Sequence, residues 1–181
     1  MKGYKSEIQQ RNIAWYLPRP KPDHYKGGMP LYAEQWLLEL AKDILEKEIS
    51  VLNLFCGMNK EGFRIDIKPG VKPDLVADAH SFASQVNQKF NVILADPPYS
   101  DLEAQELYGT PKLKYKKWTN ECDKVLVKGG LLIIYHKFVV PNPNPEKYIV
   151  VKRVFIGNRT WHLPRVAIYF MKKTNPPTKE E

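Results

Sequence analysis

Short apolar segments that end in polar or glycine-rich turns constrain the fold of this chain more than any other feature. The clearest is residues 91–95, Asn-Val-Ile-Leu-Ala, which lead directly into Asp96. Residues 51–55 and 129–136 have the same character. Apolar runs of this length, bounded by turn residues, are typical of strands that are buried on both faces. Because segments with helical character lie between them, the chain is predicted to form an α/β sheet covered by helices on both faces.

The other elements follow from the same criteria. Residues 31–48 carry apolar side chains at helical spacing and form the clearest predicted helix, with shorter helices expected within 80–90 and around Lys116–Val127. Residues 74–79 are read as a short strand or an extended segment. The predicted strands span residues 51–55, 63–67, 74–79, 91–95, 129–136, 148–157 and 166–173. The last two are joined by a short linker, which predicts an antiparallel hairpin at one edge of the sheet.

Three regions are expected along the 181 residues. Residues 1–30 are rich in proline and glycine and predict an irregular arm. Residues 31–173 are long enough for one domain with a sizeable core, and residues 174–181 read as a frayed tail. No apolar run approaches the roughly 18 residues that a membrane-spanning helix needs, so no membrane association is expected.

The composition is that of a soluble globular protein, with 43% hydrophobic and 27% charged residues. The first residues lack the apolar core of a signal peptide. Cys56 and Cys122 have neither pairing nor metal-ligand spacing, so no metal is expected. These features predict an intracellular, reduced setting, and hence a cytoplasmic protein.

The net charge of +8, with a sequence pI near 9.3, favours a polyanionic partner such as nucleic acid. The alternative is a basic surface that serves only solubility. The candidate substrate segment is residues 100–124, where basic and aromatic side chains are interleaved. Its members are Lys112, Lys114, Lys116 and Lys117 with Tyr108, Tyr115 and Trp118. A solvated helix face with its aromatic side chains turned to the core explains the same pattern.

Polar residues recur where the predicted strands end. They are residues 53–57, Asp66, residues 78–79 and residues 96–99. In open α/β sheets, ligands bind beyond the carboxyl ends of the strands. Gly57 allows a tight turn and a close ligand approach, Asp66 can accept hydrogen bonds from both ribose hydroxyls, and Asp78 can meet an exocyclic amine. Each residue alone is explained as a turn former or helix cap, but their ordered recurrence favours a ligand site.

This order of features resembles the class I methyltransferases that use S-adenosyl-L-methionine. The Asp-Pro-Pro-Tyr sequence at residues 96–99 resembles motif IV of the amino-methyltransferases, in particular the adenine-specific DNA methyltransferases. The resemblance covers residues 24–140. It implies a single Rossmann-like domain whose central sheet is mostly parallel, with one antiparallel edge strand and helices on both faces. It also implies S-adenosyl-L-methionine as cofactor and nucleic acid as partner, with DNA favoured over RNA.

The resemblance assigns roles to individual residues. Gly57 and its neighbours would form the cofactor loop, Asp66 would meet the ribose, and Asp78 would meet the adenine together with Ala79. The segment from residue 25 to residue 41 is similar to motif X, which lies near the methionine part of the cofactor. The implied cofactor-binding residues are Gly28, Met29, Pro30, Asn53, Phe55, Gly57, Asp66, Asp78 and Ala79.

The chemistry of amine methylation explains why these residue types would stand at positions 96–99. An exocyclic amine is a poor nucleophile because its lone pair is delocalised into the ring. The Asp96 carboxylate and the Pro97 carbonyl can accept its two hydrogens, and Pro97 and Pro98 hold these acceptors still. Tyr99 can stack on the extruded base. A strand that simply ends in a proline-rich turn is the alternative.

The chain also departs from the family pattern. Asn59 occupies the position of a second glycine in motif I, and its own tolerance of left-handed backbone can preserve the turn. The stretch from Phe55 to Phe63 is too short for an ordinary crossover, so its helix must shrink to one turn or become irregular. His136 is read as a core or rim histidine, and residues 157–165 as a structural loop or part of the substrate side.

Three functions remain open at this stage. The first is methylation of the exocyclic amine of adenine in DNA, and the second is methylation of an adenine or guanine amine in RNA. The third is a non-catalytic binding subunit with a methyltransferase fold. No target-recognition domain is evident, so a homodimer or a protein partner that supplies target specificity also remains open.

Overall fold

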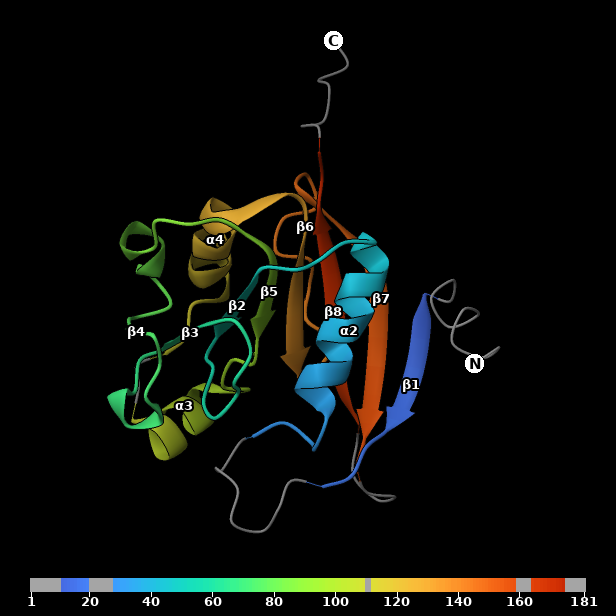
Figure 1. The fold of residues 1–181 in the computed structure, drawn as a ribbon. Helices are drawn as coiled ribbons and strands as arrows, with labels where there is room; N and C mark the ends of the chain where they lie inside the picture. Colours follow the sequence, from blue (N-terminus) through green and yellow to red (C-terminus); the bar gives the residue numbers. More distant parts are fainter. Residues whose placement is uncertain (1–10, 20–27, 110–111, 159–163, 175–181) are drawn as a thin grey trace.

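The computed structural model describes residues 11–19, 28–109, 112–158 and 164–174, and one eight-stranded sheet runs through them (Figure 1). The strand order is β1-β7-β8-β6-β5-β2-β3-β4. The strands are β1 (Asn12–Tyr16), β2 (Val51–Leu54), β3 (Phe63–Asp66), β4 (Leu75–Val76), β5 (Phe90–Ala95), β6 (Leu126–His136), β7 (Tyr148–Gly157) and β8 (Arg165–Lys172). The helices are α2 (Ala33–Leu45), α3 (Asp101–Tyr108) and α4 (Tyr115–Val125), with short 3₁₀ turns η1 (Pro69–Val71) and η2 (Phe82–Gln85).

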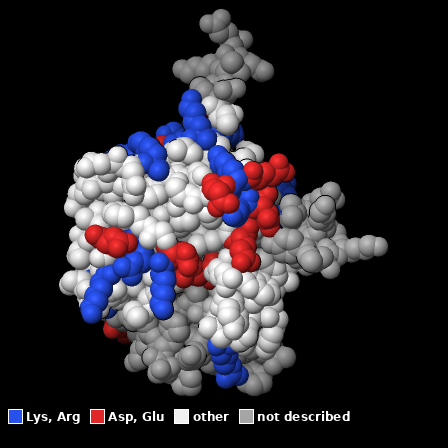
Figure 2. All heavy atoms as spheres, viewed as in Figure 1, with Lys and Arg blue, Asp and Glu red and all other residues white. Residues whose placement is uncertain are grey.

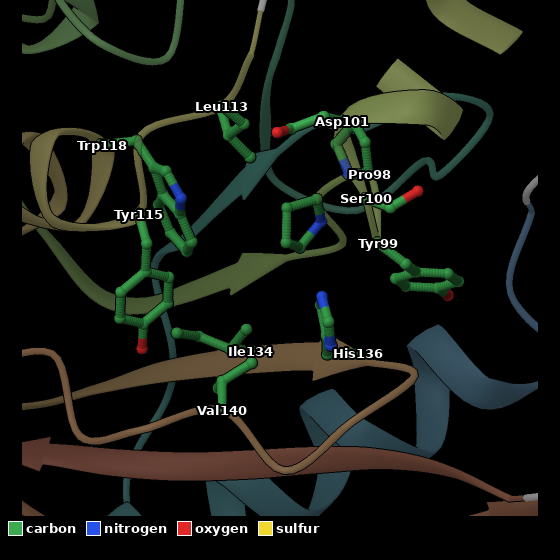
Figure 3. Close-up of a pocket in the computed structure, with 11 residues that line it drawn as sticks. Pro98, Tyr99, Ser100, Asp101, Leu113, Tyr115, Trp118, Ile134, His136 and Val140 are labelled. Carbon is green, nitrogen blue, oxygen red and sulfur yellow. The ribbon is translucent and has the colours of Figure 1, made fainter. Parts of the chain in front are cut away.

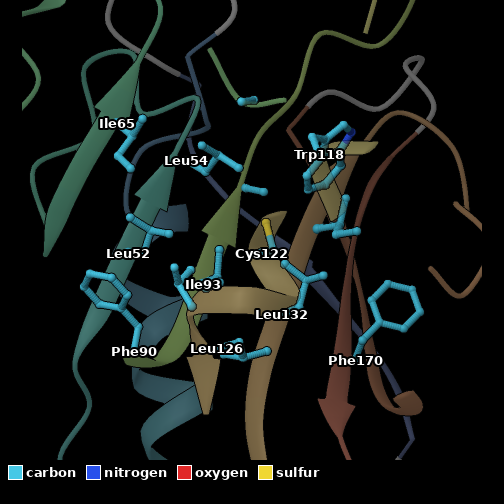
Figure 4. Packing of buried hydrophobic residues seen from close by; sticks show 14 of the residues in the cluster. Leu52, Leu54, Ile65, Phe90, Ile93, Trp118, Cys122, Leu126, Leu132 and Phe170 are labelled. Carbon is cyan, nitrogen blue, oxygen red and sulfur yellow. The ribbon is translucent and has the colours of Figure 1, made fainter. Parts of the chain in front are cut away.

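Helices cover both faces of this sheet, as predicted (Figure 1). Side chains of β5 alternate between two core clusters: Val92 and Leu94 pack with α2, whereas Ile93 and Ala95 pack with α4 and η2. Figure 4 shows the second cluster, in which Trp118 and Cys122 of α4 lie over the sheet. Each fully buried aliphatic side chain contributes about 1.5–3 kcal/mol, so these two clusters hold the layers together. Within the described residues, no helix has the length and apolar character needed to cross a membrane.

Most neighbouring strands are parallel, and the one reversed strand is β8. The predicted antiparallel hairpin of β7 and β8 is present, but the prediction that the reversed strand lies at the sheet edge is wrong. β8 lies between β6 and β7, and β1 lies outside β7. The reason is apolar content: Val166 to Phe170 are all buried, and such a run must be covered on both faces.

The prediction of an irregular arm over residues 1–30 is also wrong for Asn12–Tyr16, which form β1. This strand pairs in parallel with β7, with Asn12 opposite Arg153 and Tyr16 opposite Gly157. Only Ile13 of the five strand residues is buried, so the segment lacks the apolar run that marks the other strands. The rest of the arm that the structure describes, residues 17–19 and 28–30, has no regular structure, whereas residues 1–10 and 20–27 lie outside the described part.

Two predicted elements are shorter than expected. The segment 74–79 contains only the two-residue strand β4, and the helix expected within 80–90 is reduced to η2. The stretch between β2 and β3 contains no helix, so the crossover takes the irregular form. Its Gly62 has a φ of +74° and lies so close to β2 that a Cβ atom there would be 2.4 Å from the Val51 carbonyl oxygen. Only glycine permits this compact connection.

Candidate functional site

The carboxyl ends of the parallel strands β2, β3, β5 and β6 meet at one edge of the sheet. Because these strands run in the same direction, the residues that follow each of them are brought together there. The structure thereby gathers Gly57, Asp66, Asp96 and His136 from distant parts of the sequence. Helix α3 follows the Asp-Pro-Pro-Tyr corner at the same edge (Figure 1).

The loop after β2 is held by Asp66, at the end of the neighbouring strand. The backbone N–H of Gly57 donates to Asp66 Oδ2 at 3.0 Å, and that of Lys68 donates to Oδ1 at 2.9 Å. Gly57 has a φ of 49°, and Phe55 has a φ of 58° although it is not glycine. Left-handed backbone at a phenylalanine costs about 1–3 kcal/mol and is concentrated at ligand sites. Gly57 and Asp66, to which the resemblance gives separate cofactor roles, are therefore joined by a direct hydrogen bond.

Asn53 supports this loop from inside the protein. It is fully buried in β2, and its Nδ2 donates to Glu34 Oε1 at 2.7 Å, while Asn59 Nδ2 donates to its Oδ1 at 3.2 Å. The same Glu34 carboxylate accepts the backbone N–H groups of Lys60 and Glu61, at 3.2 and 3.1 Å. Burial raises the pKa of Glu34, against the opposing effect of these donors. Glu34, which no motif in the sequence marks as a site residue, thus connects α2 to the loop.

Asp78 and Ala79 follow β4 but are separated from it by one residue. Asp78 Oδ1 accepts from the backbone N–H of His80 at 2.8 Å and also lies 2.8 Å from His80 Nδ1. His80 Nε2 in turn accepts the backbone N–H of Lys114 at 2.9 Å. Ala79 is buried. The Asp78 turn therefore fixes the start of α4 relative to the carboxyl edge.

Gly28, Met29 and Pro30 end two residues before α2, whose first turn reaches the loop between β2 and β3 through Glu34. Met29 is buried against the α2 cluster and Pro30 is buried as well, so Gly28 is the more accessible of the three. The Pro30 carbonyl accepts the N–H of Ala33 at 3.0 Å and so begins the helix. The cofactor role that the resemblance gives to this segment stays a prediction.

The Asp-Pro-Pro-Tyr corner extends directly from β5. The Asp96 N–H donates to the Leu54 carbonyl at 3.4 Å, and the Tyr99 hydroxyl donates to Asp96 Oδ1 at 3.3 Å. The guanidinium carbon of Arg165 lies 5.2 Å from the centre of the Tyr99 ring, and His136 meets that ring edge-on at 5.1 Å. Burial, with the negative charge of Asp96, raises the pKa of Tyr99, so its hydroxyl stays protonated and can donate. Because Arg165 covers the Tyr99 ring, a stacked base would use the opposite face.

A pocket of about 170 Å³ opens beside this corner (Figure 3). Tyr99 and His136 lie on one side of it, and Tyr115 and Trp118 of α4 lie on the other (Figure 3). Trp118 meets Tyr115 edge-on at 5.6 Å and Phe55 edge-on at 5.5 Å. The other lining residues are Pro97, Pro98, Ser100, Asp101, Leu113, Ile134 and Val140. Since an apolar cavity of about 150 Å³ accommodates benzene, this volume suits one aromatic ring.

In the basic segment 100–124, the described aromatic side chains turn inward, whereas the lysine side chains are exposed. Trp118 is fully buried, and the Tyr115 hydroxyl donates to the Pro141 carbonyl at 2.6 Å, so both aromatic side chains turn inward to the pocket wall. Lys114, Lys116 and Lys117 are exposed, and Lys112 pairs with Asp101 at 2.7 Å. The side chain of Tyr108 lies outside the described residues, as do residues 159–163. On the face shown in Figure 2, basic and acidic side chains are intermixed.

The structure places Asp96 to Tyr99 directly after β5, at the strand end where the sequence predicts them. From the sequence, His136 is expected as a core or rim histidine and Arg165 as part of a structural loop or of the substrate side, and in the structure both contact the Tyr99 ring. His136 ends the apolar run of β6, and Arg165 begins β8, which runs antiparallel to β6. Both therefore lie at the carboxyl edge, and the signal that could have found them is their position at strand ends. Among the described residues, no group of three or more His, Cys, Asp or Glu side chains is arranged to hold a metal ion.

No family model and no curated protein sequence matches this chain. Solved structures match it across most of its length. The N-methyltransferase NodS from Bradyrhizobium japonicum WM9, in complex with S-adenosyl-L-homocysteine, has a TM-score of 0.60 and 13% identity over 96% of this chain and 98% of its own. A SAM-dependent methyltransferase from Agrobacterium tumefaciens has a TM-score of 0.53 and 14% identity over 81% of this chain and 63% of its own.

TrmN from Thermus thermophilus has a TM-score of 0.57 and 17% identity over 81% of this chain. The chain spans only half of the length of TrmN, 50%, and so corresponds to a part of that protein. In this chain the sheet is mostly parallel and is covered on both faces. The chain has the class I methyltransferase fold.

Proposed function

We propose that the protein is an S-adenosyl-L-methionine-dependent methyltransferase that methylates the exocyclic amine of adenine in DNA. The observation that carries this proposal is the Asp-Pro-Pro-Tyr corner at the carboxyl end of β5, beside a pocket of about 170 Å³ walled by aromatic rings. The fold supports the methyltransferase part of the proposal, and the residues of the corner support an amine as the acceptor. The net charge of +8 supports a nucleic acid as the substrate.

The residues at the carboxyl edge fit the proposed cofactor. Each Asp66 oxygen accepts one backbone N–H and retains a further lone pair, so the carboxylate can also accept both hydroxyls of a ribose. The left-handed turn at Phe55 and Gly57 brings backbone close to the space above the strands. When bound, S-adenosyl-L-methionine supplies an electrophilic methyl group on a sulfonium. Gly28 and its neighbours would hold its methionine part.

The corner residues would orient the amine. The Asp96 carboxylate and the Pro97 carbonyl accept its two hydrogens and so favour the pyramidal form, in which the lone pair is localised. Pro97 and Pro98 fix φ on both sides of the acceptor, and the Tyr99 hydroxyl holds the Asp96 carboxylate. The acceptors are thus in place before the reaction begins, which is electrostatic preorganisation. The ring-lined pocket excludes water from the base.

Transfer of a labelled methyl group tests the proposal. Duplex DNA, single-stranded DNA and RNA are each incubated with the protein and labelled S-adenosyl-L-methionine, and the modified nucleoside is identified. We expect label in N6-methyladenine from DNA. Label in RNA alone would move the substrate to RNA. Absence of transfer, together with no heat of cofactor binding in calorimetry, would contradict the enzymatic assignment and favour a non-catalytic binding subunit.

Asp96→Ala tests the role of the corner directly. We expect kcat to fall by about 10²–10³-fold, the loss typical of removing one preorganised polar group. The Kd for S-adenosyl-L-methionine, measured by calorimetry, should stay unchanged, because Asp66 and Gly57 would hold the cofactor. Asp66→Ala is the matched variant and should show the converse, with weakened cofactor binding. Full activity of Asp96→Ala would refute the role given to this carboxylate.

A further inference from the structure

The loop between β6 and β7 exposes large apolar side chains although it is fixed at both ends. Phe138 is 56% exposed and Val139 is 59% exposed. The Phe138 N–H donates to His136 Nδ1 at 3.0 Å, and the Pro141 carbonyl accepts the Tyr115 hydroxyl at 2.6 Å. The loop is therefore anchored to the sheet on one side and to α4 on the other. A fixed backbone that presents an aromatic ring to solvent is preorganised for contact with a partner.

Phe138 also continues the aromatic wall of the pocket outward. Tyr99 and His136 have ring centres 5.1 Å apart, and His136 and Phe138 have ring centres 5.9 Å apart. The three rings form a row from the Asp-Pro-Pro-Tyr corner to the protein surface. Of these, Tyr99 and His136 line the pocket itself. An occupant of the pocket that continues along this row would meet Phe138 next.

The charges around this row suit a phosphodiester chain. Lys137 Nζ lies 5.8 Å from the centre of the Phe138 ring. Across the pocket, Lys114 is exposed beside the lining residue Leu113, whereas Lys112 on its other side pairs with the lining residue Asp101 at 2.7 Å. Rings that offer faces to bases, with cations beside them for phosphates, are the usual arrangement for binding single-stranded nucleic acid. An apolar protein partner would gain nothing from these lysines.

The spacing of the rings favours an unpaired strand. Phosphates along one strand of a duplex are about 3.4 Å apart along the helix axis, which is also the separation of stacked bases. The His136 and Phe138 ring centres are 5.9 Å apart, and the rings are tilted by 47° to each other. Two neighbouring bases placed on these rings would no longer stack on each other.

We propose that Phe138 is a stacking platform for the nucleotide next to the target base, with Lys137 at its phosphate, so that the site binds an unpaired strand of at least two nucleotides. This inference rests on the proposed function.

Binding of a fluorescent, adenine-containing single-stranded DNA oligonucleotide tests the platform, with anisotropy measured in the presence of S-adenosyl-L-homocysteine. Phe138→Ala should weaken binding by about 5–150-fold, the range that stacking of one base on an aromatic ring supplies. Phe138→Trp should bind as well as the natural protein, because the ring is retained. The control is Ile149→Ala, which removes a side chain of β7 that is 46% exposed and does not line the pocket. Ile149→Ala should bind the oligonucleotide as tightly as the natural protein does.

An abasic site next to the target adenine separates stacking from a general structural effect. In the natural protein the abasic oligonucleotide should bind as weakly as the intact one binds to Phe138→Ala. In Phe138→Ala the abasic site should cost nothing further. Lys137→Ala should lower the slope of log K against log salt concentration by about 1, as expected for one lost phosphate contact.

The outcomes distinguish this inference from the proposed function. If the natural protein methylates DNA but Phe138→Ala binds and methylates the oligonucleotide equally well, the platform is refuted and the proposed function stands. If the natural protein transfers methyl groups to no nucleic acid, the proposed function fails and the platform fails with it. Loss of binding in Phe138→Trp equal to that in Phe138→Ala would also refute the stacking role.

Discussion

At the scale of single residues, the centre of the site is a chain of contacts from Arg165 through Tyr99 to Asp96. Arg165 lies over the Tyr99 ring, and the Tyr99 hydroxyl donates to Asp96. The sequence predicts the corner itself, because residues 96–99 end an apolar strand and follow Gly57, Asp66 and Asp78 in the order of the resemblance. It does not predict Arg165, since only the reversed direction of β8 brings that residue to the corner. Tyr99 therefore has two separable functions, a ring that shapes the pocket and a hydroxyl that orients Asp96.

Tyr99→Phe separates these two functions. It keeps the ring but removes the hydrogen bond to the carboxylate, and such a bond to a charged group is worth about 1.5–3 kcal/mol. We expect kcat for methyl transfer to fall by about 10–150-fold while KM for the oligonucleotide changes little. Steady-state kinetics measure both constants. Tyr16→Phe, which alters an exposed tyrosine of β1, is the control. An unchanged kcat in Tyr99→Phe would show that Asp96 needs no such support.

At the scale of elements, α2 and the β2–β3 connection act as one unit through Glu34. The helix and the strands were each predictable from apolar spacing, whereas the contact between them was not. It depends on the buried Asn53, which the resemblance assigns to the cofactor loop and for which the sequence predicts no contact with α2. Without a crossover helix, the loop has few hydrogen bonds of its own, and Glu34 supplies acceptors for its N–H groups. Glu34 takes the place of the missing crossover helix as a partner of the loop, and the local sequence pattern does not identify it.

Variants of Glu34 test this unit by chemical denaturation over a range of pH. Glu34→Ala should lower the free energy of unfolding by about 1–3 kcal/mol, because it leaves the buried Asn53 amide and two loop N–H groups without their acceptor. Burial raises the pKa of Glu34 in the folded state, so the folded protein binds this proton more tightly than the unfolded chain does. Stability should therefore fall as the pH rises from the ordinary value of 4.5 through the higher folded pKa.

Glu34→Gln is the matched variant, because it keeps an acceptor oxygen but cannot ionise. The decline in stability above pH 4.5 should be absent from Glu34→Gln. Denaturation curves for the natural protein and Glu34→Gln that differ by a constant amount at every pH would contradict this account of Glu34.

At the scale of the whole molecule, the end of the sheet opposite the site is held by Asp123 of α4. Its Oδ2 pairs with Lys147 at 2.7 Å, and its Oδ1 pairs with Lys172 at 3.0 Å and accepts the Tyr148 hydroxyl at 3.1 Å. Burial alone would raise the pKa of Asp123, but these donors outweigh it and hold the pKa below its ordinary value. The network connects α4 to the start of β7 and the end of β8. The pairing of β7 with β8 follows from their short linker, whereas the position of β8 beside β6 does not follow from the sequence, because strands of similar apolar character do not reveal their neighbours.

Asp123→Asn tests whether this network contributes to the free energy of unfolding without affecting cofactor binding. At pH 7 we expect the free energy of unfolding to fall by about 1–2 kcal/mol, discounted for the exposure of Lys147. Because the folded pKa is depressed, this contribution is present above the ordinary value of 3.8 and is lost as the pH falls through the folded pKa. The two proteins should thus converge in stability at low pH. The Kd for the cofactor should stay the same, and a weakened Kd would show that the two ends of the sheet are coupled.

The position of β1 has a consequence for the order in which the chain can fold. Arg11, next to β1, donates to the carbonyl of Val150, which lies 139 residues further along the chain. As β1 pairs only with β7, it has no partner strand until nearly all of the domain has been synthesised. Contacts this distant in sequence form slowly, and the outer side of β7 stays open to other strands in the meantime. Among the described strands, the first in sequence is therefore among the last to be incorporated, and it covers β7 and becomes the edge strand of the sheet itself.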